Sequence, residues 1–175
     1  MSWFALFVKS GEERDVEGFI NQHFDKQSLF CYVPKKLVPE KKQGCVHDSA
    51  KVIFPGYVFI NTSIISALYH RLRKTPKIYY LVKSGDHKLD QSYSPYSEIP
   101  DEEMDMFLQL VGPNDMLGYS DVIVMNKRAK VIAGPLFGKE GIIRKIDKRK
   151  GRAKIEVMFL GETRMIEVGI NILST

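Results

Sequence analysis

The sequence predicts an α+β protein in which a ferredoxin-like split βαβ domain, with its helices on one face of the sheet, precedes a small five-stranded β-barrel. The elements expected within residues 1–111 follow the order β-α-β-β-α-β-α, which is the order of that fold. Beyond residue 120 the pattern changes to short strands separated by glycine turns, which indicates a barrel. We therefore expect a first domain at 1–111, a linker at 112–120 and a second domain at 121–175.

The first domain is expected to open with a strand at Trp3–Val8, which has apolar side chains on both faces. Ser10 and Glu13 have the spacing of a capping box, so a helix is predicted to begin there and to continue to about Gln27. A second strand is expected at Leu29–Val33. The apolar side chains of the helix recur at its period, at Val16, Phe19, Ile20, His23 and Phe24.

Two contrasting segments follow. Lys35–Ala50 is polar and rich in lysine, so we expect either a hairpin arm or a disordered loop. Val52–Asn61 has three aromatic and four β-branched side chains and is expected to form one strand that is apolar on both faces. Both faces of such a strand must be buried, either by other elements of the fold or by a partner.

The first domain is expected to end with two helices and a short strand. The second helix begins after a capping residue at 61–63, a strand follows at Ile78–Val82, and a third helix begins after Pro100. The intervening segment, Lys83–Ser97, has the composition of a loop.

Helices on one sheet face would leave aromatic side chains on the other. The side chains expected beneath the helices are Phe4, Leu6, Val8, Phe54, Val58 and Ile60. Phe7, Tyr57 and Phe59 would then lie on the open face. Exposed apolar patches usually mark interfaces, so these rings are expected to bind a partner. The alternative is that Tyr57 and Phe59 are core residues beneath the Lys83–Ser97 loop.

The second domain is short-stranded and strongly basic. Its strands are expected at Asp121–Met125, Ala129–Ala133, Gly141–Ile146, Ala153–Leu160 and Arg164–Val168, with Ile170–Leu173 as a possible closing piece. Residues 121–175 hold 12 Lys and Arg against 6 Asp and Glu, whereas residues 1–120 hold 14 against 15. This imbalance makes the second domain the candidate for nucleic-acid binding, and a merely solvated basic surface is the alternative.

Catalytic and metal-binding patterns are missing from the sequence. Gly134–Glu140 has phosphate-loop glycines at the wrong spacing and a glutamate where Ser or Thr must bind magnesium. Cys45 and His47 have no second ligand pair at zinc spacing. We expect a binding protein with no catalytic residues, metal or cofactor. Two cysteines without a disulfide framework, and no signal or membrane segment, predict a cytoplasmic protein.

The first domain resembles an RNA-recognition motif in its element order and in two strands. Leu6–Lys9 is similar to the first signature strand of that motif, and Gly56–Ile60 to the second. Pro55 stands where the motif has a basic residue, and residues 1–120 have a net charge of −1. Both departures are unfavourable for binding phosphate.

A second resemblance covers almost the whole chain. Trp3–Glu13 is similar to the opening of the N-terminal (NGN) domain of the NusG family, and Phe54–Phe59 resembles the signature strand of that domain. Lys74–Pro76 stands at the Asn-Thr-Pro of the family. Lys130–Ile143 is similar to a KOW motif, and Glu156–Leu173 to the rest of its SH3-like barrel. The two signatures occur in the order and spacing of the family.

The resemblance implies a bacterial transcription elongation factor, without enzymatic activity, that acts as a monomer. In the family, the open face of the first domain binds the clamp helices of RNA polymerase. The matching positions here are Phe7, Phe54, Pro55, Tyr57 and Phe59. Strand alternation places Phe54 beneath the helices, whereas the family pattern places it at the edge of the contact. Lys74 and Thr75 match positions that face the nontemplate DNA strand, and Lys74 replaces the Asn of the family, which favours a phosphate contact.

The basic second domain distinguishes two kinds of family member. In general NusG proteins the KOW domain binds a termination factor or the ribosome. In this chain it carries eleven cations in 28 residues, namely Lys127, Arg128, Lys130, Lys139, Arg144, Lys145, Lys148, Arg149, Lys150, Arg152 and Lys154. This charge, together with the lysine-rich arm, resembles LoaP-type antiterminators, and we expect the domain to bind nascent RNA, such as a hairpin. The sequence does not name the target operon or the RNA.

Overall fold

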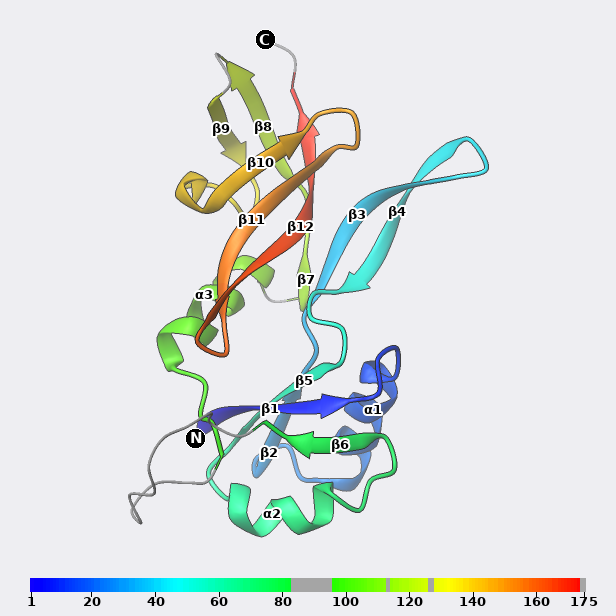
Figure 1. The fold of residues 1–175 in the computed structure, drawn as a ribbon, viewed down its shortest axis with the longest axis vertical. Helices are drawn as coiled ribbons and strands as arrows, with labels where there is room; N and C mark the ends of the chain where they lie inside the picture. The colour runs from blue at the N-terminus through cyan, green and yellow to red at the C-terminus, as the bar shows by residue number, and fades with distance from the viewer. Residues whose placement is uncertain (83–95, 113, 126–127, 174–175) are drawn as a thin grey trace. The chain divides into compact units, whose positions relative to one another are not determined.

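The protein forms two compact units that do not follow the order of the sequence. The computed structural model describes the chain except for residues 83–95, 113, 126–127 and 174–175 (Figure 1). Unit 1 contains residues 1–33 and 54–104, and unit 2 contains residues 34–53 and 105–175. The expected boundaries at 111 and 121 follow the sequence alone and remain a prediction.

Unit 1 has the predicted split βαβ sheet. Its strands are β1 (Ser2–Val8), β2 (Leu29–Tyr32), β5 (Tyr57–Thr62) and β6 (Ile78–Leu81), which lie in the order β2-β5-β1-β6. All neighbouring pairs are antiparallel. Helix α1 (Glu13–His23) follows β1, and α2 (Ile65–Leu72) follows β5. Strand alternation places Phe4, Leu6 and Val8 on one face, where they are buried.

The start of α1 differs from the predicted capping box. The N-cap residue is Glu12, and its side chain makes no capping hydrogen bond. Glu13 is buried, and its carboxylate accepts hydrogen bonds from the backbone N–H of Gly11, at 3.0 Å, and of Gly56, at 2.6 Å. The capping box is therefore wrong, because Glu13 binds a turn that lies 43 residues further along the chain.

The predicted strand at 52–61 is interrupted. Strand β4 ends at Val52, residues 53–56 form a turn, and β5 begins at Tyr57. Pro55 has no N–H to donate to a sheet, and Gly56 has a φ of +85°, a value that glycine adopts without strain. The break resets the alternation of side chains, so the expectation that Phe54 shares a face with Val58 is wrong.

Unit 2 is built on a curled five-stranded sheet, as predicted. Its strands are β8 (Ser120–Met125), β9 (Arg128–Ala133), β10 (Ile143–Asp147), β11 (Arg152–Phe159) and β12 (Glu162–Ile172), in the order β10-β11-β12-β8-β9. Strand β12 includes most of the segment expected as a separate closing piece. Alternate side chains of β11 are buried, which places Ala153, Ile155, Val157 and Phe159 in the core. A 3₁₀-helix at Glu140–Ile142 precedes β10, and α3 (Asp101–Val111) precedes the strands of the curled sheet.

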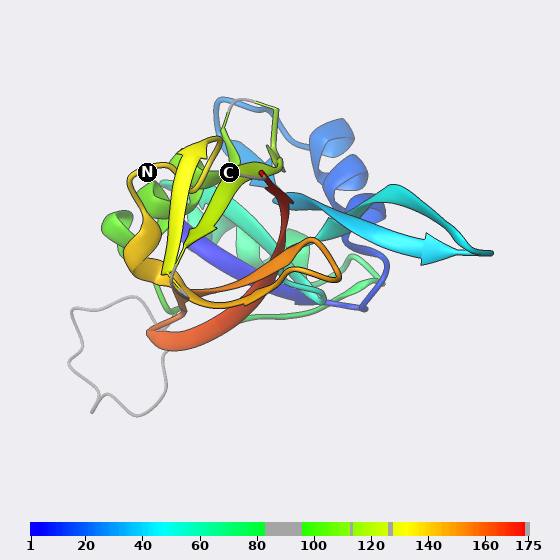
Figure 2. The same ribbon diagram turned by 90° about the horizontal axis from the view of Figure 1, so that it is seen from above.

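The lysine-rich segment forms the hairpin arm, the first of the two expected alternatives. Strands β3 (Lys35–Lys42) and β4 (Cys45–Val52) pair over their whole length, and the turn that joins them projects away from the curled sheet (Figures 1 and 2). Gln43 and Gly44 both have positive φ angles, of 50° and 86°, which suits a two-residue hairpin turn. The base of β3 also pairs with the short β7 (Met116–Leu117). The arm therefore belongs to unit 2, although it is inserted in the sequence of unit 1.

Candidate functional site

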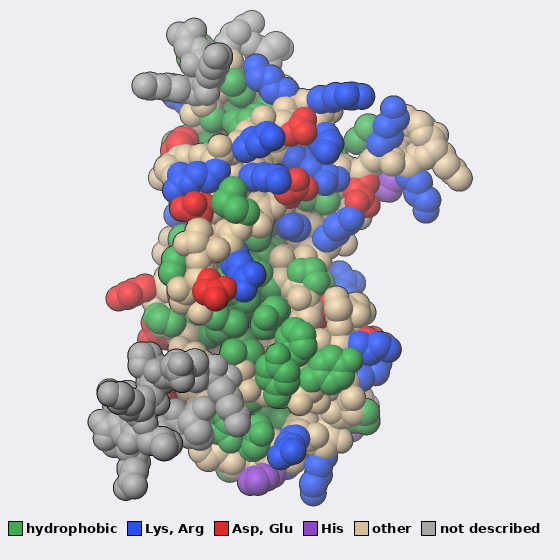
Figure 3. Space-filling view, viewed as in Figure 1, with side chains coloured by type: hydrophobic (Ala, Val, Ile, Leu, Met, Phe, Trp, Pro, Cys, Tyr) green, Lys and Arg blue, Asp and Glu red, His purple; other side chains and the backbone are tan. Residues whose placement is uncertain are grey.

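An exposed aromatic cluster lies on the sheet of unit 1, opposite the side chains buried beneath the helices. It comprises Phe7, Tyr57, Tyr79 and Tyr80. The Phe7 ring is the centre, with its centroid 5.3 Å from that of Tyr57, 5.0 Å from that of Tyr80 and 5.9 Å from that of Tyr79. Phe7 and Tyr57 are half-buried, and apolar side chains gather on this face of unit 1 in Figure 3.

Two members of the cluster were not expected from the sequence. Tyr79 and Tyr80 are 54% and 51% exposed, although successive residues of a regular strand point to opposite faces. The pairing of β1 with β6 shifts between Phe7 and Val8, which pair with Tyr80 and Ile78. Tyr79 is the extra residue of this bulge, and bulges commonly redirect side chains. In the sequence, the adjacent aromatic residues Tyr79 and Tyr80 were the signal from which their place in the cluster could have been predicted.

The expected exposure of Phe59 is wrong. Its side chain is 1% exposed, and its ring centroid lies 6.4 Å from that of Tyr32 and 6.0 Å from that of Phe54. Phe54 is also buried, and its ring packs against that of Phe59. Pro55 is exposed in the turn before β5. The predicted aromatic strip thus divides into a buried half and the exposed aromatic cluster.

Lys74 and Thr75, the two residues expected to face DNA, differ in their exposure to solvent. Lys74 is exposed at the end of α2, whereas Thr75 is 6% exposed. The Thr75 backbone donates to the Leu72 carbonyl and accepts from Ile78, so the residue joins α2 to β6. The expectation that the Thr75 side chain faces a ligand is therefore wrong, and Lys74 remains as the candidate.

The predicted basic residues lie mainly on the surface of unit 2. Figure 3 shows lysine and arginine side chains gathered over the strands of the curled sheet and on the arm. Of the predicted set, the exposed members are Lys130, Arg144, Lys145, Lys148, Arg149, Lys150 and Lys154, whereas Lys139 and Arg152 are half-buried. Lys127 and the side chain of Arg128 lie outside the described residues.

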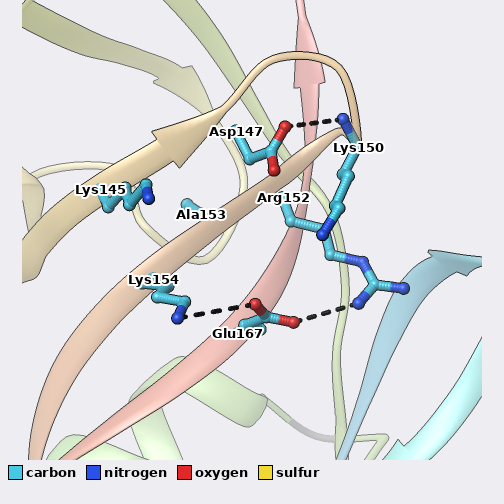
Figure 4. Close-up of a pocket in the computed structure, with 7 residues that line it drawn as sticks. All are labelled: Lys145, Asp147, Lys150, Arg152, Ala153, Lys154 and Glu167. Carbon is cyan, nitrogen blue, oxygen red and sulfur yellow. Dashed lines mark hydrogen bonds and ion pairs between the residues drawn. The ribbon is translucent and has the colours of Figure 1, made fainter.

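Four of the cations border a small pocket of about 120 Å³, which we call the basic pocket (Figure 4). It is lined by Lys145, Asp147, Lys150, Arg152, Ala153, Lys154 and Glu167. Glu167 lies 3.0 Å from the Arg152 guanidinium and 4.0 Å from the Lys154 ammonium. Asp147 accepts a hydrogen bond from the backbone N–H of Lys150 at 3.0 Å, which stabilises the hairpin turn.

Two predicted RNA-binding arginines have partners within the protein. The Arg144 guanidinium makes a two-point contact with Glu156, at 3.1 and 2.8 Å, which lowers the pKa of that carboxyl. Arg152 donates to the Pro39 carbonyl, at 3.2 and 2.6 Å, as well as to Glu167. Within the described part of the chain, the ammonium groups of Lys145, Lys148 and Lys150 form no ion pair.

The family is shown by comparison with known proteins. The model of the family described as "Transcription termination factor nusG" matches residues 1–108, and the KOW motif model matches residues 125–158. The chain belongs to the NusG family. The NusG transcription termination/antitermination protein of Buchnera aphidicola is 26% identical over 95% of this chain and 91% of its own length. That of Escherichia coli K12 is 25% identical over the same shares, and that of Pseudomonas aeruginosa is 22% identical over 95% and 93%.

A solved structure supports the same fold for this NusG-family chain. The structure titled "Domain interaction in Thermotoga maritima NusG" matches with a TM-score of 0.53 at 21% identity, over 96% of this chain and 92% of that one. The relatives are named as transcription factors and not as enzymes, which agrees at the family level with the expected lack of catalysis. In the described residues, no group of three or more His, Cys, Asp or Glu side chains could hold a metal ion, and no helix is long and apolar enough to cross a membrane.

Proposed function

We propose that this NusG-family transcription factor is an elongation and antitermination factor that binds RNA polymerase through unit 1 and RNA through unit 2. The observation that carries the first part is the aromatic cluster. Three tyrosine rings contact the Phe7 ring on a sheet face, and two of the tyrosines are about half exposed to water. Such a patch costs free energy unless a partner covers it.

The family resemblance supplies the identity of that partner. The exposed cluster includes Phe7 and Tyr57, which match positions that contact the polymerase clamp helices in the family. Tyr79 and Tyr80 extend the same surface, and Pro55, which also matches the family contact, is exposed in the turn that precedes Tyr57. Aromatic side chains of this kind commonly dominate the affinity of protein interfaces. Holding the clamp closed would suppress pausing by a mechanical effect without bond chemistry.

The polymerase contact is tested by the double variant Tyr57→Ser/Tyr80→Ser. We expect binding to core RNA polymerase, measured by biolayer interferometry, to weaken at least about 100-fold, because interface hot spots each contribute about 2 kcal/mol or more. The control is Tyr69→Ser, a half-buried tyrosine on α2 outside the aromatic cluster. Circular dichroism checks that all variants are folded. Unchanged affinity of the folded double variant would refute the contact.

The exposed cations of unit 2 support the RNA part of the proposal. Lys145, Lys148 and Lys150 have no ion-pair partner among the described residues, and Arg149 is exposed beside them. The triple variant Lys148→Ala/Arg149→Ala/Lys150→Ala should weaken binding to RNA hairpins. It should also reduce the slope of log affinity against log salt by about 0.7–0.9 for each phosphate that the variant no longer binds. The same variant should fail to promote readthrough of a terminator in transcription assays.

The names of the relatives favour a second candidate, a general NusG protein whose KOW domain binds a termination factor or the ribosome. The two functions make opposite predictions for the whole chain. An operon-directed, LoaP-type antiterminator should bind RNA hairpins more tightly than it binds either protein. Tight binding to a termination factor or a ribosomal protein, with no binding to any hairpin, would establish the general function.

A nontemplate DNA contact at Lys74 is the third part of the proposal. Lys74 is exposed and has no ion pair within the described residues, so it can contact a phosphate. Lys74→Gln should reduce crosslinking of the protein to the nontemplate strand in an elongation complex without weakening polymerase binding. Arg14→Gln, which removes an exposed cation from α1, is the control.

A further inference from the structure

The β3–β4 arm and the curled sheet of unit 2 are joined by specific contacts. The Arg152 guanidinium donates two hydrogen bonds to the Pro39 carbonyl of β3, at 3.2 and 2.6 Å. The Tyr119 hydroxyl donates to Asp48 of β4 at 2.6 Å. A Cβ atom at Gly169 of β12 would lie 2.7 Å from the Leu37 carbonyl oxygen, so only glycine allows β3 to approach this closely. The base of the arm is thus fixed beside the basic pocket.

The base of the arm adds two cations to this region. Lys36 and Lys51 are directly opposite each other in the hairpin, an arrangement in which like charges are unfavourable. Lys36 is half-buried, and burial lowers the pKa of its ammonium group, with further effects from the charges of Glu167, Arg152 and Lys51. Lys36 immediately precedes Leu37, whose carbonyl oxygen lies against Gly169 of β12, the strand that also carries Glu167 of the basic pocket.

The charges of the combined region do not balance. Its cations are Lys36, Lys51, Lys145, Lys150, Arg152 and Lys154, and its carboxylates are Glu40, Asp48, Asp147 and Glu167. Six cations face four carboxylates, and Glu40 is already paired with Lys51. A region with this excess, in which one lysine is partly desolvated, is stabilised by an added anion.

We infer that the base of the β3–β4 arm and the basic pocket form one binding site for the phosphate backbone of a structured nucleic acid. The inference rests on the proposed RNA contact of unit 2 and extends it to Lys36 and Lys51, which lie far from the KOW motif in the sequence. Arg152 acts as a positioning residue, because its guanidinium is occupied by Pro39 and Glu167 and holds the arm in place. The lysines make the contacts.

The test compares charge-removal variants of the full chain at two salt concentrations. The probe is a fluorescein-labelled RNA hairpin of arbitrary stem sequence, since backbone contacts carry no sequence information. Between about 50 and about 200 mM salt, the wild-type protein should lose about tenfold more affinity than Lys36→Gln/Lys51→Gln, because two phosphate contacts are missing in the variant. Lys36→Arg/Lys51→Arg should retain the wild-type slope, since both charges are kept.

Two further variants separate this inference from the proposed function. Lys26→Gln/Arg73→Gln removes two exposed cations from unit 1 and should leave the slope unchanged. Lys145→Gln/Lys150→Gln, which removes two cations of the basic pocket, should reduce the slope of log affinity against log salt. If the pocket variant loses affinity and the arm variant does not, the composite site is refuted while the RNA contact stands. If the wild-type protein binds no hairpin, both the composite site and the proposed RNA contact of unit 2 are refuted.

The nature of the ligand is resolved with two more probes. A DNA hairpin of the same sequence should bind with a similar salt slope if the site reads only phosphates, whereas a much weaker DNA complex would assign the site to RNA. A fluorescein-labelled polyglutamate peptide should bind far more weakly than either. If the peptide binds as tightly as the hairpins and responds equally to Lys36→Gln/Lys51→Gln, the site is one for acidic protein segments and the inference is overturned.

Discussion

At the scale of single residues, Glu13 has the most informative contacts in unit 1. A buried carboxylate is costly unless its oxygens accept strong hydrogen bonds, and Glu13 accepts them from Gly11 and Gly56. Gly56 immediately precedes Tyr57 of the aromatic cluster. Glu13 therefore fixes the turn from which the proposed polymerase contact projects, although the residue itself is hidden from any partner.

We expect Glu13→Gln to lower the free energy of unfolding by about 1–2 kcal/mol, because a neutral amide oxygen accepts these bonds less strongly. Trp3, the single tryptophan, lies in β1 and allows unfolding of unit 1 in urea to be followed by fluorescence. The control is Glu12→Gln, which removes surface ion pairs with Lys9 and Lys77 and should cost less than about 1 kcal/mol. Equal losses for the two variants would contradict this role.

The two cysteines provide a second residue-scale prediction. Cys31 is buried in β2, and burial raises the pKa of its thiol, so little reactive thiolate forms at mildly alkaline pH. Cys45 is exposed near the tip of the arm. Iodoacetamide at about pH 8 should modify Cys45 alone in the folded protein and both thiols in urea, which mass spectrometry of tryptic peptides would show. Rapid labelling of Cys31 in the folded protein would contradict the packing of β2.

At the scale of secondary-structure elements, the sequence predicted most strands and helices because side-chain periodicity reflects burial. It did not predict the break at Pro55 and Gly56, since the apolar pattern continues through it and the break is maintained by a hydrogen bond that the Gly56 N–H donates to the distant Glu13. It also missed the bulge that exposes both Tyr79 and Tyr80, because a bulge depends on the pairing of two strands. The candidate site changed accordingly, with two tyrosines added and Phe59 found buried.

The close approach of β3 to β12 gives a prediction at this scale. Gly169→Ala would place a methyl group against the Tyr119 ring and the Leu37 carbonyl, so we expect a destabilisation of about 1–3 kcal/mol from overpacking. Amide hydrogen exchange should become faster along Lys35–Lys42. Gly141→Ala is the matched control, because nothing lies within 4 Å of its added Cβ. Protected arm amides in the Gly169 variant would show that β3 does not depend on this packing.

At the scale of the whole molecule, the fold class could be predicted from the sequence, but the packing of the β3–β4 arm within unit 2 could not. A hairpin inserted between two strands of one sheet is assigned by its sequence position to that domain, as in the predicted first domain at 1–111. Its packing partners in β12 and β7 lie more than 60 residues further along the chain, at Met116–Leu117 and Glu162–Ile172. Sequence periodicity carries no information about such distant pairing.

This arrangement predicts how a fragment would behave. A fragment of residues 112–175 contains the KOW motif but lacks the arm, and with it the Pro39 carbonyl that accepts from Arg152. We expect the fragment to unfold at a lower temperature than unit 2 does in the whole chain. It should also bind RNA hairpins with a shallower salt dependence, since Lys36 and Lys51 are absent. Identical salt slopes for fragment and whole chain would argue against a role for the arm.

The division of unit 2 between residues 34–53 and 105–175 also matters while the protein is being made. The ribosome releases the arm before any strand of the curled sheet exists, so the early hairpin has nothing to pack against, and an isolated two-stranded hairpin is marginally stable at best. Unit 1 can fold as soon as residue 104 emerges, because all of its residues are then available. We therefore expect a nascent chain in which unit 1 is folded while the lysine-rich arm is still unpacked. A translation product that ends before the curled sheet would remain in that state.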